Sequence, residues 1–192
     1  ENVDGNDSAR GIGIRLPSSS GIRAGAAIKE FEAGFNPALG FINRRGVTDY
    51  TFDTSYTYRP RGGPIQSIKS SFDTQSFVLI DGRLQSRSLN YRPLYLTNRK
   101  GDSVDLVYRD TKEVLFAPFA ISAGVLIPMG EYQFHDIGGQ LRTGNHRRVA
   151  ALIRYVDGTF YGGTKSDVVG ELTWRPSARF RGNVSYNYSE IA

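Results

Sequence analysis

The chain has 192 residues, which is enough for one domain with a hydrophobic core but few for two. Its 24 Lys and Arg against 19 Asp and Glu give a net charge of +5 that is scattered along the sequence, so nucleic acid is not expected as a partner. The absence of cysteine excludes disulfides, thiolate metal sites and cysteine nucleophiles, and the absence of 18 consecutive apolar residues excludes a transmembrane helix.

The first residues, ENVDGNDSARG, are polar and rich in glycine. Asp4, Asn6 and Asp7 form a tight cluster, but a calcium loop needs a longer series of ligands that ends in a bidentate acid. We therefore expect a flexible tail over 1–8, followed by one domain over 9–192.

From residue 9 onward, apolar and polar residues alternate with a period of two. In 49–58 every Tyr and Phe is at an even position and every Asp is at an odd one, and 180–188 repeats the pattern. Alternation of this kind predicts half-exposed β-strands rather than helices. The predicted strands are 9–16, 22–33, 47–59, 65–80, 83–96, 103–110, 131–143, 147–157, 165–175 and 179–189.

Strand 83–96 has the poorest pattern, because Pro93 interrupts the alternation. A proline cannot donate a hydrogen bond to a neighbouring strand, so a bulge or an early end of the strand is expected there.

The connections between these strands carry turn residues and alternate in length. The five connections 17–21, 59–64, 98–102, 143–145 and 175–178 are short and fall on one rim of an up-and-down sheet. The other rim receives the longer segments 34–46, 111–130 and 157–164, together with a tight turn at Asp81–Gly82. Short turns on one rim and long loops on the other are typical of an outer-membrane barrel.

Two architectures fit the alternation. In a soluble β-sandwich the apolar face packs on a second sheet, whereas in a membrane barrel it faces lipid and the polar face lines the interior. Aromatic residues near the short turns and a mixed-charge polar face favour the barrel. The fold prediction is therefore all-β: an antiparallel up-and-down meander of about ten strands that forms a complete small or a partial outer-membrane β-barrel.

The barrel hypothesis assigns residues to the polar interior and to the membrane interface. The interior or rim residues that we predict to bind a solute are Arg23, Lys29, Asp49, Asp53, Arg109, Arg154, Glu171 and Arg181. The predicted membrane-interface residues are Tyr56, Tyr58, Trp174, Tyr186, Tyr188, Arg147 and Arg148. In 130–157, the predicted lipid-facing residues are Tyr132, Phe134, Val149, Ala151, Ile153 and Tyr155.

Arg147 and Arg148 have two possible roles. They could bind a lipid phosphate, or they could anchor a periplasmic turn with their aliphatic stems in the membrane, which we favour.

His135 and His146 are the two histidines of the chain. A hairpin that turns at 143–147 separates them by roughly 25 Å, too far to share one metal ion. We expect His135 to lie in the wall, paired with Asp136 or a neighbour, and His146 in a turn. No metal and no cofactor are predicted.

The sequence gives little support for catalysis. Asp49 and Asp53 are four residues apart on one strand face, roughly 13 Å between backbones and too far for a retaining glycosidase pair. No G-x-S-x-G motif occurs, and DGTFYGGT at 157–164 lacks the residues of a phosphate loop. We expect no catalytic residues in this chain.

Several segments resemble one family: FNPALGFINRR (35–45), DGRLQSRSL (81–89), IPMGEYQF (127–134), TGNHRR (143–148) and DGTFYGG (157–163). The chain resembles bacterial outer-membrane β-barrels classed as a domain of unknown function, which follow a carbohydrate-binding family 9-like domain. The resemblance implies an outer-membrane location, a sugar-binding-like domain upstream and further strands downstream, so that the chain is an internal fragment.

Three functions remain open at this point. The first is a barrel module that contacts outer-membrane lipid and serves as membrane anchor or passage for a carbohydrate. The second is a glycan- or lipid-acting hydrolase at the long-loop rim, for which Glu32, Glu113 and Glu131 are the acids to test. The third is a soluble β-sandwich that binds a ligand.

Overall fold

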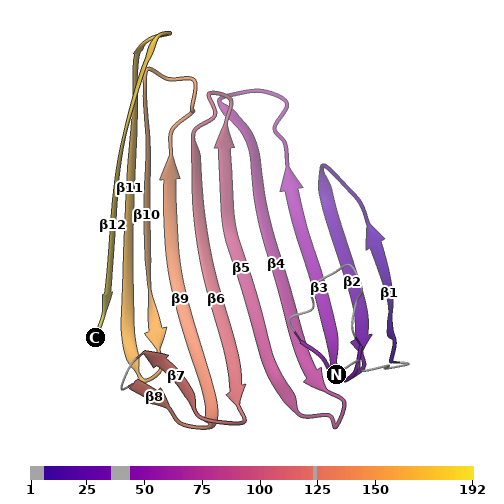
Figure 1. The fold of residues 1–192 in the computed structure, drawn as a ribbon. Helices are drawn as coiled ribbons and strands as arrows, with labels where there is room; N and C mark the ends of the chain where they lie inside the picture. Colours follow the sequence, from indigo (N-terminus) through magenta and orange to yellow (C-terminus); the bar gives the residue numbers. More distant parts are fainter. Residues whose placement is uncertain (1–6, 36–43, 123–124) are drawn as a thin grey trace.

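The computed structural model describes residues 7–35, 44–122 and 125–192, and these residues form β-strands joined by turns and loops. Ten strands make one antiparallel sheet whose order follows the chain, and two short strands form a separate hairpin (Figure 1). The strands are β1 (Ala9–Leu16), β2 (Gly21–Phe31), β3 (Val47–Tyr58), β4 (Ile65–Leu79), β5 (Leu84–Asn98), β6 (Ser103–Leu115), β7 (Phe119–Ser122), β8 (Val125–Ile127), β9 (Gly130–Arg142), β10 (Val149–Phe160), β11 (Gly163–Ser177) and β12 (Phe180–Ile191).

The all-β class, the meander and all ten predicted strands of the large sheet are confirmed. Over the described residues, no helix has the length and apolar character needed to cross a bilayer.

Two predicted loops are wrong. The segment 111–130 is largely strand, because β6 continues to Leu115 and the hairpin β7–β8 follows it. The segment 157–164 is a two-residue turn, because β10 pairs with β11 as far as Phe160 and Gly163. Tyr161 and Gly162 make this turn with positive φ angles of 43° and 91°, as a type I′ hairpin requires.

Pro93 coincides with a bulge in β5, one of the two outcomes expected there. The pairing of β5 with β6 shifts register between Tyr91 and Leu94, and β5 then continues to Asn98. A proline inside a strand is accommodated at a bulge because the ladder hydrogen bond is already missing there.

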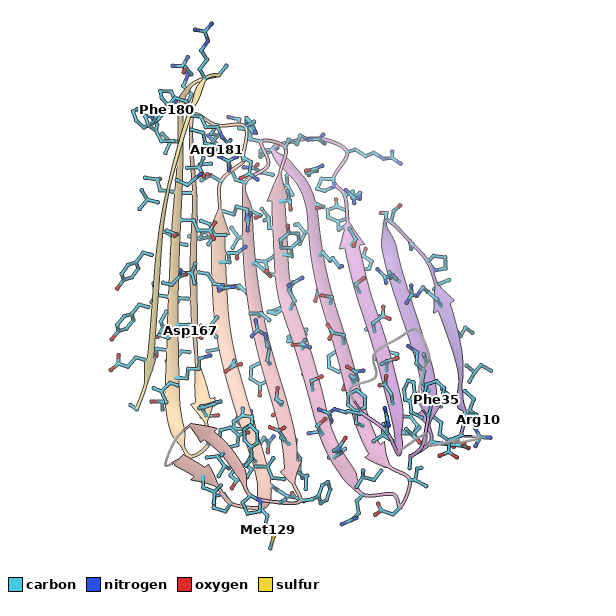
Figure 2. The ribbon with its side chains drawn as sticks, viewed as in Figure 1. Arg10, Phe35, Met129, Asp167, Phe180 and Arg181 are labelled. Atoms are coloured by element: carbon cyan, nitrogen blue, oxygen red, sulfur yellow. The ribbon has the colours of Figure 1, made fainter. Side chains whose placement is uncertain are left out.

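The sheet has two rims, which Figure 1 shows at its upper and lower ends. The short-turn rim (upper) carries the turns 17–20, 59–64, 99–102, 143–148 and 178–179. The long-loop rim (lower) carries the connections 32–46 and 116–129, and the tight turns 80–83 and 161–162. Figure 2 shows Phe180 and Arg181 at the first rim and Met129 at the second.

β1 and β12 are the edge strands of the sheet, and within the described residues they do not pair with each other. Residues 1–6, which include Asp4 and Asn6 of the predicted tail, lie outside the described residues. Ser8 and Asp7 are hydrogen-bonded to the β2–β3 connection: Ser8 N donates to Glu32 at 2.7 Å, and Gly34 N donates to Asp7 at 2.5 Å.

Candidate solute-binding surface and the two faces of the sheet

The two faces of the sheet differ in composition, because one carries an uncharged band and the other carries charges of both signs. Directly paired residues of an antiparallel sheet share a face, so the register assigns every side chain to one side. We call the uncharged, mainly apolar stretch of one face the apolar band; many of its side chains are exposed, with Ile14 at 78%. The band comprises Ile12, Ile14, Leu16, Ile22, Ala24, Ala26, Ile28, Tyr50, Phe52, Thr54, Tyr56, Tyr58, Ile68, Ser70, Phe72, Thr74, Leu89, Tyr91, Leu94, Leu96, Val104, Leu106, Tyr108, Ile137, Gly139, Leu141, Val149, Ala151, Ile153, Tyr155, Val168, Gly170, Leu172, Trp174, Val184, Tyr186 and Tyr188.

The apolar band contains no Asp, Glu, Lys or Arg among these described residues. It is seven residues tall on β10 (Val149–Tyr155) and nine on β3 (Tyr50–Tyr58), or about 23–30 Å along the strands at about 3.3 Å per residue. That height is close to the roughly 25 Å of a lipid-facing band.

Beyond the band, toward the long-loop rim, the same face becomes polar. Arg10, Glu30, Arg87, Asp110 and Asp157 are among the residues that follow it there. The strands therefore continue past the band with mostly polar side chains on this face.

The edge of the band drifts steadily across the sheet. On β12 the edge of the band is at Glu190. Following the paired residues from Glu190 strand by strand across the sheet leads to Leu16 on β1. The edge on β1, however, is at Arg10, six residues (16 − 10) from Leu16. A shift of six residues along the strands is roughly 20 Å, and nine strand spacings across the sheet are roughly 43 Å. The strands are therefore inclined by roughly 25° to the normal of the band edge.

The opposite face, the polar face, holds every residue predicted for the interior. The register places Arg23, Lys29, Asp49, Asp53, Arg109, Arg154, Glu171 and Arg181 on it. Charges of both signs neighbour each other there: Arg23 lies 3.7 Å from Asp53, and Lys29 is paired in register with Asp49. Asp49 is 6% exposed and accepts a hydrogen bond of 2.9 Å from Gln75. The prediction that these carboxylates balance basic residues on adjacent strands is consistent with this geometry.

The centre of the polar face is hollowed. A cavity of about 290 Å³ lies over β4, β5, β6, β9 and β10. Its polar lining is Ser71, Asp73, Asn90, Arg92, Asp105, Arg109, Gln140 and Arg154. The Nε of Arg92 lies 2.8 Å from Asp105, and Asn90 donates to Asp73 at 2.8 Å. This surface offers many hydrogen-bond donors and acceptors to a hydrophilic solute.

Arg109 and Arg154 were predicted members of this hollow, whereas Arg92 and Asp105 were missed. The bulge at Pro93 breaks the alternation next to Arg92, so the sequence pattern did not reveal its face. Asp105 could have been found, because it alternates regularly with Val104 and Leu106 on a well-formed strand.

The prediction that Tyr132 and Phe134 face lipid is wrong. They pair with Glu113 and Thr111 and therefore lie on the polar face. Both rings contact Tyr161 edge-on, with centroids 5.0 and 4.8 Å away, and Tyr161 donates a hydrogen bond of 3.0 Å to Glu113. Burial and this carboxylate raise the pKa of the Tyr161 phenol. The other four predicted residues, Val149, Ala151, Ile153 and Tyr155, lie in the apolar band.

The predicted aromatic interface residues also lie in the apolar band. Tyr56, Tyr58 and Trp174 are in its part near the short-turn rim, and Tyr186 and Tyr188 follow on β12. Trp174 is 51% exposed and contacts Phe180 edge-on.

Arg147 and Arg148 lie in the β9–β10 turn, and Arg147 has a specific partner. Its Nε and Nη2 donate to the carboxylate of Asp102 in the neighbouring turn at 3.0 and 2.6 Å. Asn98 and the Gly144 amide also donate to Asp102. The hydrogen bonds from Arg147, Asn98 and Gly144 hold the pKa of Asp102 well below its usual range. Arg147 therefore ties two short turns together.

The histidines lie far apart in the topology, as expected, and of the two partners predicted for His135 the structure shows a neighbour rather than Asp136. His135 Nδ1 lies 2.9 Å from Asp110 and 3.1 Å from the Tyr108 hydroxyl, on the face of the apolar band. Asp136 is on the opposite face, 3.9 Å from Arg109. His146 is in the β9–β10 turn. Over the described part of the chain, no three His, Asp or Glu side chains gather as a metal cage.

The acids of the hydrolase hypothesis do not form a pair. Glu32 accepts from Ser8 N, Glu113 from Tyr161, and Glu131 lies 2.6 Å from Lys112. Glu113 and Glu131 are on opposite faces, because Glu113 is in register with Tyr132. Part of the proposed rim, residues 36–43 and 123–124, lies outside the described residues.

Comparison with known proteins gave no match to a family model, to a curated protein or to a solved structure. The interpretation of the site therefore depends on its geometry.

Proposed function

We propose that the chain forms ten neighbouring strands of a bacterial outer-membrane β-barrel, with the apolar band against lipid and the polar face toward a water-filled interior. The observation that carries this proposal is the uncharged, exposed band that crosses all ten strands. A soluble protein rarely exposes an apolar patch much larger than a few hundred Å², and such a surface otherwise marks a membrane or protein contact.

The inclination of the strands supports lipid over a second packed sheet. A bilayer is a flat slab, so strands tilted to its normal must enter it at a different residue on each strand. A drift of six residues across ten strands fits that expectation, and closed barrels have similar but larger tilts of roughly 35–45°.

The two rims support an orientation. Barrels have short periplasmic turns and longer extracellular loops, so the short-turn rim is assigned to the periplasm and the long-loop rim to the outside. The strand ends that carry polar side chains beyond the band then project into the external medium.

The interior then holds or passes a hydrophilic solute, and the hollow around Arg109 and Arg154 is the candidate contact site. Its guanidinium, carboxylate and amide groups suit a polyhydroxylated ligand such as an oligosaccharide. Aromatic rings at Tyr132 and Tyr161 line the same face nearer the long-loop rim. The family resemblance adds a sugar-binding-like domain upstream and further strands that close the wall. Without passage of a solute, the module serves as a membrane anchor.

The single tryptophan of the chain tests the membrane assignment. Trp174 is near the short-turn rim in the apolar band, so lipids brominated on their acyl chains should quench its fluorescence strongly after reconstitution. Quenching by acrylamide from the aqueous phase should be weak. A monodisperse, folded chain without detergent, with Trp174 open to acrylamide, would instead establish the soluble β-sandwich.

Conductance tests the role of the interior. In the full-length protein, replacing Arg109 and Arg154 by Gln should shift the ion selectivity toward cations and change the block by added oligosaccharide. The matched control, Arg61→Gln with Arg179→Gln, removes the same charge from turns at the short-turn rim. A protein that never conducts and never takes up oligosaccharide would leave the anchor function alone.

A further inference from the structure

We propose that Arg87 and Lys112 form a binding site for the phosphate of an outer-leaflet lipid headgroup, with the acyl chains of that lipid along the apolar band. The inference rests on the proposed function, because it needs the band in lipid and the long-loop rim outside.

The position of the two cations fits a headgroup. Arg87 on β5 and Lys112 on β6 are direct register partners on the face of the apolar band. They lie just beyond its edge, because Leu89 and Tyr108 are the last band residues on these strands. A lipid whose chains cover Leu89, Tyr91 and Leu106 has its headgroup at the level of Arg87 and Lys112.

The charges around Arg87 are only partly balanced. Like charges directly opposite each other on neighbouring strands repel, so Arg87 and Lys112 need an anion between or beside them. Lys112 lies 2.6 Å from Glu131, but the Nη2 of Arg87 lies 3.6 Å from Asp110, beyond hydrogen-bond length. The Arg87 side chain is 44% exposed and makes no hydrogen bond among the side-chain contacts of the described residues.

One carboxylate oxygen of Asp110 is already occupied by other partners, and the other, Oδ1, is buried without a hydrogen bond. Asp110 is 7% exposed, accepts a hydrogen bond of 2.7 Å from Gln133, and lies 2.9 Å from His135 Nδ1. The oxygen that faces these two groups is Oδ2, and Arg87 is left with the more distant Oδ1. The guanidinium therefore keeps its donors for an external acceptor, and a phosphate offers oxygens that an arginine fork can bind in pairs.

The polar groups next to Arg87 and Lys112 fix the structure around the two cations. Tyr108 and His135 stack with their ring centroids 6.4 Å apart, and the Tyr108 hydroxyl is 3.1 Å from the imidazole. The backbone N of His135 donates to Thr159 on β10 at 3.0 Å. Three neighbouring strands, β6, β9 and β10, thus support one polar platform at the edge of the band.

The short-turn rim offers a contrast that favours this location. Arg147 there donates from Nε and Nη2 to Asp102, so one edge of its guanidinium is used within the protein. The lipid-phosphate role considered for Arg147 from the sequence is better filled by Arg87.

The test is native mass spectrometry of the full chain with lipid A as the phosphate-bearing lipid and dephosphorylated lipid A as the matched neutral lipid. We expect one lipid A to bind, and the dephosphorylated form to bind about tenfold more weakly, since two charge-assisted hydrogen bonds are lost. Arg87→Gln with Lys112→Gln should weaken lipid A binding by a similar factor. Arg61→Gln with Arg179→Gln, which removes equal charge at the other rim, should leave it unchanged.

A second variant separates binding from folding. Asp110→Asn keeps the shape of the carboxylate but removes its competing charge, so lipid A should bind several-fold more tightly, which structural damage would not produce. Equal binding by the wild type and the Arg87/Lys112 variant would overturn the proposal. So would full competition by inorganic phosphate, because the site would then take a free anion. Failure of acyl-brominated lipid to quench Trp174 would instead overturn the membrane assignment.

Discussion

The two faces of the sheet are built from the same ten strands, yet they carry opposite kinds of side chain. In the apolar band many side chains remain exposed, whereas on the polar face most charges have a neighbour of the opposite sign. On β11 the consecutive residues Val168 and Val169 have the same side chain on opposite faces. The comparison teaches that residue type alone does not define the environment of a position in this sheet. The environment is defined by whether the position is odd or even on its strand, which sets the face, and by its distance from the two rims.

The largest effect is expected from a charge placed in the apolar band. Leu172→Arg should lower the free energy of unfolding in vesicles by about 2–4 kcal/mol, because lipid cannot solvate a guanidinium near the middle of the band. Denaturant titration followed by Trp174 fluorescence measures this change.

Val169→Arg is the matched control, three residues away on the polar face of the same strand, β11. It should change the free energy of unfolding by less than about 1 kcal/mol, because the new side chain is among the polar groups of the interior. Equal costs for the two variants would mean that both faces are in water or both are packed, and the lipid assignment would fail.

A smaller effect is expected at Asp49 and Tyr50, where an apolar substitution should cost more on the polar face than on the apolar face. Asp49→Leu should destabilise the sheet by about 1–3 kcal/mol, because it removes the acceptor of Gln75 and the carboxylate opposite Lys29. Tyr50→Leu, on the apolar face, should cost less than about 1.5 kcal/mol, since one apolar side chain replaces another. The same titration compares them, and a costlier Tyr50→Leu would contradict the assignment of faces.

The smallest effect is expected at Asp102, which belongs to neither face. Its pKa is lowered in the folded state, so its contribution to stability is complete above the unfolded pKa of about 3.9 and is lost as the pH falls below that value. Unfolding midpoints measured from pH 7 downward should fall less steeply below about pH 4 in Asp102→Asn than in the wild type. Parallel curves would show that the link between the two turns contributes nothing.

Sequence alternation predicted the strands well because an exposed apolar face and a polar face repeat every two residues on nearly every strand. The prediction of faces failed where the alternation is interrupted. Gly138 and Gly139 carry no side chain to mark a face, so the orientation of Tyr132 and Phe134 could not be read from the alternation that follows. Pro93 concealed Arg92 in the same way, since a bulge changes parity without changing composition.

The hollow could be predicted only in part. Arg109 and Arg154 were found because each is a charged residue in a regular alternation. Their proximity to Asp73 and Arg92 depends on the register of five strands, and register is set by turn lengths that the sequence gives poorly. The turn at Tyr161–Gly162 illustrates this, since the three glycines in 157–164 indicated a long loop where a two-residue hairpin occurs.

The drift of the band edge makes depth a property of the whole sheet rather than of any single strand. Leu16 and Glu190 occupy one continuous row of the ladder, yet Leu16 belongs to the band and Glu190 lies beyond it. If the membrane assignment holds, an equivalent position counted from a turn is in hydrocarbon on one strand and in water on another. Inserting two residues into one strand, which preserves the alternation of faces, would then displace the lipid boundary on that strand and leave it unchanged on its neighbours.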